Sequence, residues 1–238
     1  MFKYNIESKT YFNYFIIIFF LIFLFTGFMI VEDYGMPLDQ LEYRQQGIII
    51  LTHLGNLFFP ELTNEITQNY DVTTIKKYQE TFIFSGVPFH AMSSLAEYLF
   101  GIEEKKEIYY FKYKFSFLFN FLGILVFYFF LRDRFKNNII SFLGILTVIL
   151  SPRIFPELFY SPNDIPFLSS LCFFLYFSYK LFKKFNYKNI FFLSFFSGFL
   201  AAMRTGGIIF PLIFFLILVI NEYLNKEINK KFIYKFLF

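Results

Sequence analysis

The length, composition and charge of this 238-residue chain place it among integral membrane proteins. Hydrophobic residues make up 57% of it and its mean hydropathy is +0.52, which is too apolar for a soluble domain. The net charge of +4 is better explained by cations retained in cytoplasmic loops than by a nucleic-acid surface. The single cysteine, Cys172, excludes an intramolecular disulfide, and its apolar surroundings favour packing over reactivity.

The first predicted element is a membrane span over residues 12–31, FNYFIIIFFLIFLFTGFMIV. About 20 apolar residues suffice for a helix to cross the roughly 30 Å hydrocarbon layer. The apolar run is longer than that of a signal peptide and no small-residue cleavage site follows, so we expect the span to be retained. Glu32 and Asp33 then emerge at the membrane boundary.

Residues 32–107 form a polar segment that holds twelve of the eighteen acidic residues, and we expect it to lie outside the membrane. Within it, residues 37–52 and 88–100 predict interfacial helices on the outer surface, each beginning at a proline, and Gly101 is a predicted stop. The second helix would carry His90, Ser94 and Glu97 on one side and apolar residues on the other. Residues 61–80 lack periodicity and predict a loop.

Further spans are predicted after this loop, which gives an all-α polytopic bundle of about six spans. Their connections alternate between basic and non-basic segments, as the positive-inside rule requires, so the basic ones should be cytoplasmic. The loop 32–107 and the links 151–166 and 204–207 then share the opposite, extracytoplasmic side. The additional spans are 108–131, 139–155, 165–182, 189–203 and 206–221, and the basic connections lie at 132–136, 180–188 and 226–235.

Charged residues recur at the outer ends of these spans. Charges at membrane depth usually pair or serve a function, so two interpretations stay open: structural ion pairs that cap helix ends, or a binding site. An arginine on the outer side is informative, because its planar fork suits a phosphate. The residues concerned are Asp33, Lys112, Lys114, Arg153, Asp164 and Arg204.

The sequence does not require a metal or an organic cofactor. His53 and His90 each lack a second histidine at ligand spacing, and ordinary packing explains them better than a metal site. Glu32, Asp33 and Asp39 offer oxygen ligands to a divalent cation, but their spacing does not demand one. Walker-type and dinucleotide-binding glycine patterns are missing from the sequence.

Four short motifs resemble those of GT-C membrane glycosyltransferases of the protein O-mannosyltransferase and aminoarabinose-transferase type. They are Glu32-Asp33-Tyr34-Gly35, Leu38-Asp39, Ser151-Pro152-Arg153-Ile154-Phe155 and Ser161-Pro162-Asn163-Asp164-Ile165-Pro166. The resemblance implies transfer of a hexosyl or pentosyl unit from a dolichyl- or undecaprenyl-phosphate donor. It also implies that Asp33 is the essential acidic residue, here a general base, and that Arg153 and Asp164 belong to a loop motif.

The donor phosphate would then lie near a group of charged residues at the outer face, in a membrane that we expect to be the bacterial inner membrane with its periplasmic side active. The acceptor stays open between lipid, glycan and protein. Candidate donor-binding residues are Arg153, Arg204, Asp164, Asp39 and Glu32.

Members of this superfamily usually have more spans, so the resemblance implies an N-terminal part of such an enzyme, or a half-length member, whose own activity is open. The alternative is a non-enzymatic membrane protein, a transporter or lipid-binding scaffold. Transporters tend to show repeated halves, and no repeat relates spans one to three with spans four to six, which favours the enzyme.

Overall fold

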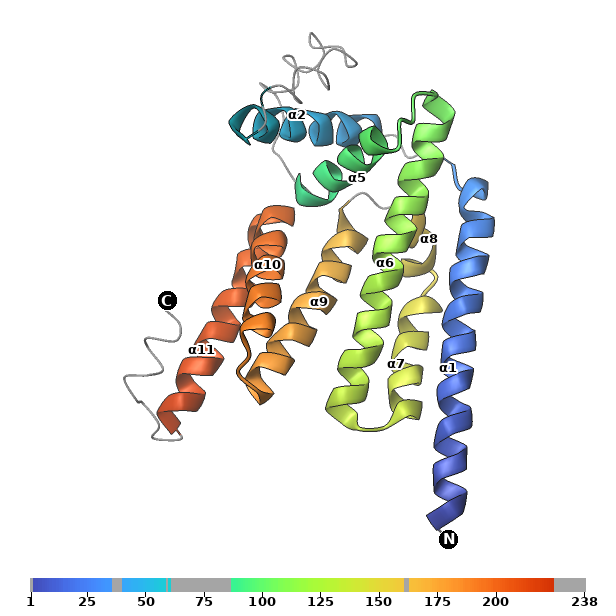
Figure 1. The fold of residues 1–238 in the computed structure, drawn as a ribbon, viewed down its shortest axis with the longest axis vertical. Helices are drawn as coiled ribbons and strands as arrows, with labels where there is room; N and C mark the ends of the chain where they lie inside the picture. The colour runs from blue at the N-terminus through green and yellow to red at the C-terminus, as the bar shows by residue number, and fades with distance from the viewer. Residues whose placement is uncertain (1, 36–39, 59, 61–86, 161–162, 225–238) are drawn as a thin grey trace.

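The computed structural model describes all residues except 1, 36–39, 59, 61–86, 161–162 and 225–238 (Figure 1). The described residues form helices and no strand, which confirms the all-α prediction. Long helices run up and down through a bundle, and two others, α2 (Gln40–Phe58) and α5 (Val87–Leu99), lie across its upper end. The bundle helices are α1 (Phe2–Ile30), α6 (Lys105–Phe135), α7 (Asn138–Ile149), α9 (Asp164–Lys183), α10 (Tyr187–Met203) and α11 (Ile209–Leu224).

The helices confirm a polytopic membrane protein, whereas the count of six spans stays a prediction. By length and composition, three helices can cross a membrane: Tyr11–Asp33, Lys106–Phe135 and Asp164–Lys183. The pair α7 and α8 (Ile154–Tyr160) would make a fourth if it is one broken span. The last two helices are apolar but shorter. Outward faces of α1 and α11 carry many exposed aliphatic and aromatic side chains, as contact with lipid allows.

The predicted span over 139–155 is divided between two helices, α7 and α8, and whether the pair crosses the membrane stays a prediction. Helix α7 ends at Ile149, and α8 follows after a bend of 69°. The break coincides with Pro152, which has no amide N–H to donate and disfavours helical geometry at Ser151 before it. The motif around Arg153 therefore lies at a corner between two helices.

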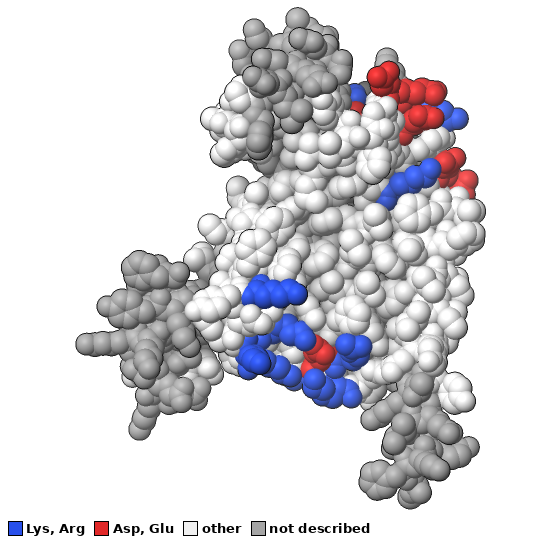
Figure 2. All heavy atoms as spheres, viewed as in Figure 1, with Lys and Arg blue, Asp and Glu red and all other residues white. Residues whose placement is uncertain are grey.

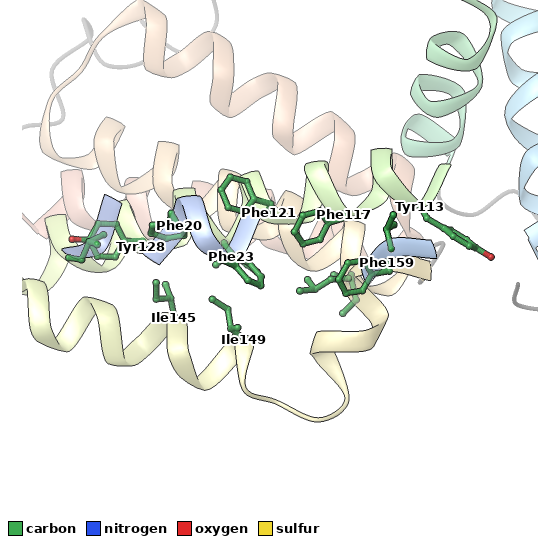
Figure 3. Packing of buried hydrophobic residues seen from close by; sticks show 14 residues of the cluster. Phe20, Phe23, Tyr113, Phe117, Phe121, Tyr128, Ile145, Ile149 and Phe159 are labelled. Carbon is green, nitrogen blue, oxygen red and sulfur yellow. The ribbon is translucent and has the colours of Figure 1, made fainter. Parts of the chain in front are cut away.

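Helix α6 lies at the centre of the bundle and contacts α1, α5, α7, α8 and α9. The ring of Phe117 on α6 stacks on Phe159 of α8 with 4.9 Å between centroids (Figure 3). On Phe159, the ring of Tyr34 also stacks, at 4.5 Å. The hydroxyl of Tyr113 donates to the carbonyl of Gly35 at 3.3 Å. Because these aromatic contacts hold Tyr34 and Gly35, they also fix where the chain leaves α1 after Asp33.

A buried polar network ties α8 to its neighbours. The side-chain amide of Asn120, fully buried on α6, donates to the carbonyl of Leu158 at 2.9 Å, and its oxygen accepts from the hydroxyl of Ser169 on α9 at 2.9 Å. The residue four positions after Leu158 is Pro162, which has no N–H with which to satisfy that carbonyl. Asn120 supplies the missing donor, so α6, α8 and α9 are held together.

Helix α5 turns its polar face towards the protein, whereas an ordinary interfacial helix turns its polar face towards water. Its polar side chains His90 and Glu97 are buried in protein, whereas Met92 and Leu99 are exposed. Close packing on α2 makes this possible, because a Cβ on Gly47 would lie 2.5 Å from the carbonyl oxygen of His90. The predicted stop at Gly101 is confirmed, with a left-handed φ of 63° directly after the helix.

The core contact between α1 and α6 gives a first prediction. A Cβ on Gly27 would lie 1.9 Å from the ring of Phe117, whose position is fixed by its stacking on Phe159. Gly27→Ala should therefore lower stability by about 1–3 kcal/mol, the usual cost of overpacking a core. Thermal unfolding in detergent measures the change.

Gly198→Ala is the matched control, because nothing lies within 4 Å of a Cβ at that helical position. It should leave stability unchanged or raise it by about 0.5–1 kcal/mol. An unchanged melting temperature for Gly27→Ala would contradict the described α1–α6 contact.

Candidate functional site

Charge divides the bundle into two ends (Figure 2). At what we call the basic end, lysines and arginines gather where α6, α9 and α10 meet the loops: Arg132, Arg134, Lys136, Lys180, Lys183, Lys184 and Lys188. The opposite end, which we call the site end, lies under α2 and α5 and holds the acidic candidates (Figure 1). This division agrees with the charge alternation of the sequence.

Among the residues that the structure describes, the rim of the site end carries three ion pairs. Lys114 donates to Glu32 at 3.2 Å, Arg153 donates to Glu157 at 3.3 Å, and Arg204 pairs with Asp164. Their charged groups are largely exposed, so each pair contributes about 0–1 kcal/mol to stability. Of the charged residues predicted at the outer span ends, Lys114, Arg153, Asp164 and Arg204 thus form exposed ion pairs. Asp39 lies outside the described residues.

Asp33 ends the short 3₁₀ helix Val31–Asp33 and is exposed at the site end. Among the described residues it forms no ion pair, unlike its neighbour Glu32. Burial, then Tyr160, then the Asp33 carboxylate raise the pKa of Tyr34. Asp33 is therefore an accessible carboxylate on a turn whose position is fixed by aromatic packing.

A buried charged cluster lies beneath this rim and joins α2, α5 and α6. The Nε of Arg44 lies 3.1 Å and 3.2 Å from the two carboxylate oxygens of Glu97, whose side chain is 1% exposed. The ammonium of Lys112 lies 4.0 Å from the same carboxylate and is 4% exposed. That distance exceeds a hydrogen bond, so Glu97 compensates the charge of Lys112 only in part. A cavity of about 390 Å³ opens beside Arg44 and Glu97.

His90 belongs to the same buried region. Its Nε2 lies 3.0 Å from Oδ1 of Asn163, so that nitrogen carries the donated proton, and its ring stacks on Tyr43 at 4.9 Å. Burial, and then the positive charge of Lys112, lower the pKa of His90 from 6.5 to about 3, and the hydrogen bond that His90 donates to Asn163 opposes this shift. The imidazole is therefore neutral. It links α5 to Asn163, the residue before α9, whose side chain does not cap its own helix.

Sequence reasoning missed the buried cluster. His90 was assigned to ordinary packing, and Arg44, Glu97 and Asn163 were not candidates. The available signal is the spacing of His90, Ser94 and Glu97 on one face of the helix predicted over 88–100. The described residues contain no group of three or more acidic, histidine or cysteine side chains that could hold a metal ion, so the carboxylates Glu32 and Asp33 lack a third ligand there.

The fold and this region define a helical integral membrane protein with a charged site under two crossing helices. Residues 93–238 match the family model described as dolichyl-phosphate-mannose-protein mannosyltransferase. The chain therefore belongs to this family of GT-C-type membrane glycosyltransferases, which confirms the resemblance. Comparison with curated proteins and with solved structures finds no match.

The match divides the candidate residues into two sets. It includes the rim residues Arg153, Asp164 and Arg204 and the buried residues Glu97 and Lys112. It begins later in the sequence than Glu32, Asp33 and Asp39, so the family match says nothing of these acids. The role of Asp33 stays a prediction.

The buried state of His90 predicts an acid-sensitive stability. Because its pKa is lowered from 6.5 to about 3, the unfolded chain takes up a proton that the folded protein does not. The stabilisation that comes from this difference in proton uptake is complete above pH 6.5. It is lost as the pH falls towards 3, at about 1.4 kcal/mol per pH unit. His90→Gln keeps a donor for Asn163 but does not titrate.

Between pH 7 and pH 5, the wild-type protein should thus lose about 2 kcal/mol more than His90→Gln. Chemical unfolding of both proteins in detergent at the two pH values measures the difference. Equal losses in the two proteins would show that His90 is not buried in its neutral form.

Proposed function

We propose that this chain transfers a sugar from a polyprenyl-phosphate donor to an acceptor at the site end of the bundle, with Asp33 as general base. Membership of the mannosyltransferase family supports the class of reaction. The observation that carries the proposal is Lys112, a buried lysine whose nearest described carboxylate, Glu97, lies 4.0 Å away and is already bonded to Arg44. A protonated lysine at this place is suited to the phosphate of an anionic donor.

The chemistry follows from the two kinds of charge at this end. A hydroxyl or amine of the acceptor attacks the anomeric carbon of the sugar, and the bond from that carbon to the phosphate oxygen breaks. Asp33 takes the proton of the nucleophile, and a polyprenyl phosphate leaves. Negative charge on the departing phosphate grows in the transition state, so a fixed cation lowers the barrier.

The rim residues complete the proposed donor site. Arg204 with Asp164, and Arg153, lie within the matched range and at the same end as Lys112. Each arginine already contacts an acid, so a phosphate would bind beside or in place of that contact. Glu32 and Asp39 remain proposed donor-binding residues, and a divalent cation is compatible with their oxygens but not required.

Orientation in the membrane is part of the same proposal. The basic end carries the lysines and arginines that the positive-inside rule assigns to the cytoplasm, so the site end faces outward. In a bacterial inner membrane that side is the periplasm, where a polyprenyl-linked sugar and its acceptor meet.

The role of Asp33 gives a prediction that separates catalysis from stability. Asp33→Asn is nearly isosteric but does not accept the proton, so turnover should fall by about 10²–10⁴-fold with an unchanged melting temperature. Turnover is measured with a radiolabelled polyprenyl-phosphate sugar, and melting by thermal unfolding in detergent. Asp39→Asn is the neighbouring control. A stable and fully active Asp33→Asn protein would remove the assignment.

The role of Lys112 predicts a loss of donor binding. Lys112→Met should weaken binding of polyprenyl phosphate by roughly 10–100-fold, the effect of losing a charge-assisted hydrogen bond. Lys114→Met is matched to it, because Lys114 lies two residues along the same helix but pairs with the exposed Glu32. Equal weakening by both variants, measured by lipid titration in nanodiscs, would refute a specific role for Lys112.

A further inference from the structure

A second region of the molecule has the features of a lipid site and lies away from the proposed reaction. An apolar cavity of about 530 Å³ opens between α1 and α6 in the half of the bundle that includes the basic end. Apart from three polar residues, Asn13, Tyr128 and Arg132, its lining is entirely aliphatic or phenylalanine. The remaining lining residues are Ile16, Ile17, Phe20, Leu21, Leu24, Phe121, Leu125 and Phe129.

The cavity has the depth of one membrane leaflet. Along α1 it runs from Asn13 to Leu24, and along the antiparallel α6 from Arg132 to Phe121. At a rise of 1.5 Å per residue, these stretches span roughly 16 Å, about half of the 30 Å hydrocarbon thickness. Asn13 and Arg132 lie together at the basic end, and the other end of the cavity is apolar.

Arg132 is available to a ligand at the mouth of this cavity. Its side chain is exposed, and among the described residues it forms no ion pair. The adjacent acid, Asp133, is instead held by Lys180 on α9 at 2.6 Å. The guanidinium of Arg132 lies 4.9 Å from the ring centroid of Phe129, which also lines the cavity, so the charge is fixed beside the apolar wall.

We propose that this cavity binds a glycerophospholipid with an anionic head group from the leaflet at the basic end. One acyl chain fills the space between α1 and α6, and the lipid phosphate contacts Arg132. The charged group of the cavity, Arg132, lies at the basic end. This position favours the phospholipid over the polyprenyl-phosphate donor, whose phosphate is proposed to bind at the other end near Lys112. The lipid would thus add to the packing between α1 and α6 on this side of the two helices, without taking part in the reaction.

The test measures lipid retained by the purified protein. Wild-type protein in nanodiscs or detergent, supplied with equal phosphatidylglycerol and phosphatidylcholine, should retain phosphatidylglycerol preferentially when analysed by native mass spectrometry. Arg132→Gln should reduce the retained phosphatidylglycerol by roughly tenfold or more, and Arg132→Lys should restore part of it. Leu21→Trp should reduce retention by filling the cavity without changing the charge.

Arg134→Gln is the matched control, because Arg134 lies one half-turn away on α6 and does not line the cavity. Equal losses in Arg132→Gln and Arg134→Gln would show only general attraction to the basic end and overturn the site. Displacement of phosphatidylglycerol by polyprenyl phosphate would assign the cavity to the donor instead. Absence of bound lipid from the wild-type protein would overturn the proposal, because another segment or nothing would then fill the cavity. None of these readouts depends on glycosyl transfer.

Discussion

The burial of Glu97 is the constraint on which the site end depends. A carboxylate that is almost fully removed from solvent needs partners, and it finds them on two other helices, in Arg44 of α2 and Lys112 of α6. Breaking such a pair leaves a buried charge uncompensated, at a cost of about 3–5 kcal/mol. The crossing helices α2 and α5 are therefore joined to the bundle by charge as much as by apolar packing.

This arrangement separates two kinds of charged groups at one end of the protein. Rim pairs such as Glu32–Lys114 are exposed and contribute little to stability, so they are free to exchange partners with a substrate. The buried charges are fixed by their neighbours, as Glu97 is by Arg44. Fixed charges stabilise a transition state better than mobile ones, because little reorganisation is needed during the reaction. A transferase that releases an anionic phosphate needs exchangeable groups to bind its substrate and fixed charges to stabilise its transition state.

The opposite end is held together differently. Lys180 pairs with Asp133, and Tyr179 donates to the carbonyl of the same residue at 2.7 Å, which ties α9 to the last turn of α6. The remaining cations there face outward, where anionic lipid head groups are the natural counter-charge. Helix α6 thus carries Lys112 near one end and Arg132 near the other.

The sequence by itself determined the membrane class, the helical content, the charge asymmetry of the two ends and the stop at Gly101, because these depend on local composition and on single residues. It also supported the family on short motifs. Only the tertiary structure decided which charges are buried. Glu97 meets Arg44, 53 residues away, and His90 meets Asn163, 73 residues away. Periodicity predicts that α5 has a polar and an apolar face, but not which one turns inward. At a membrane boundary lipid accepts the apolar face, so the polar face is free to pack against protein, and the partners that neutralise it are chosen by the fold.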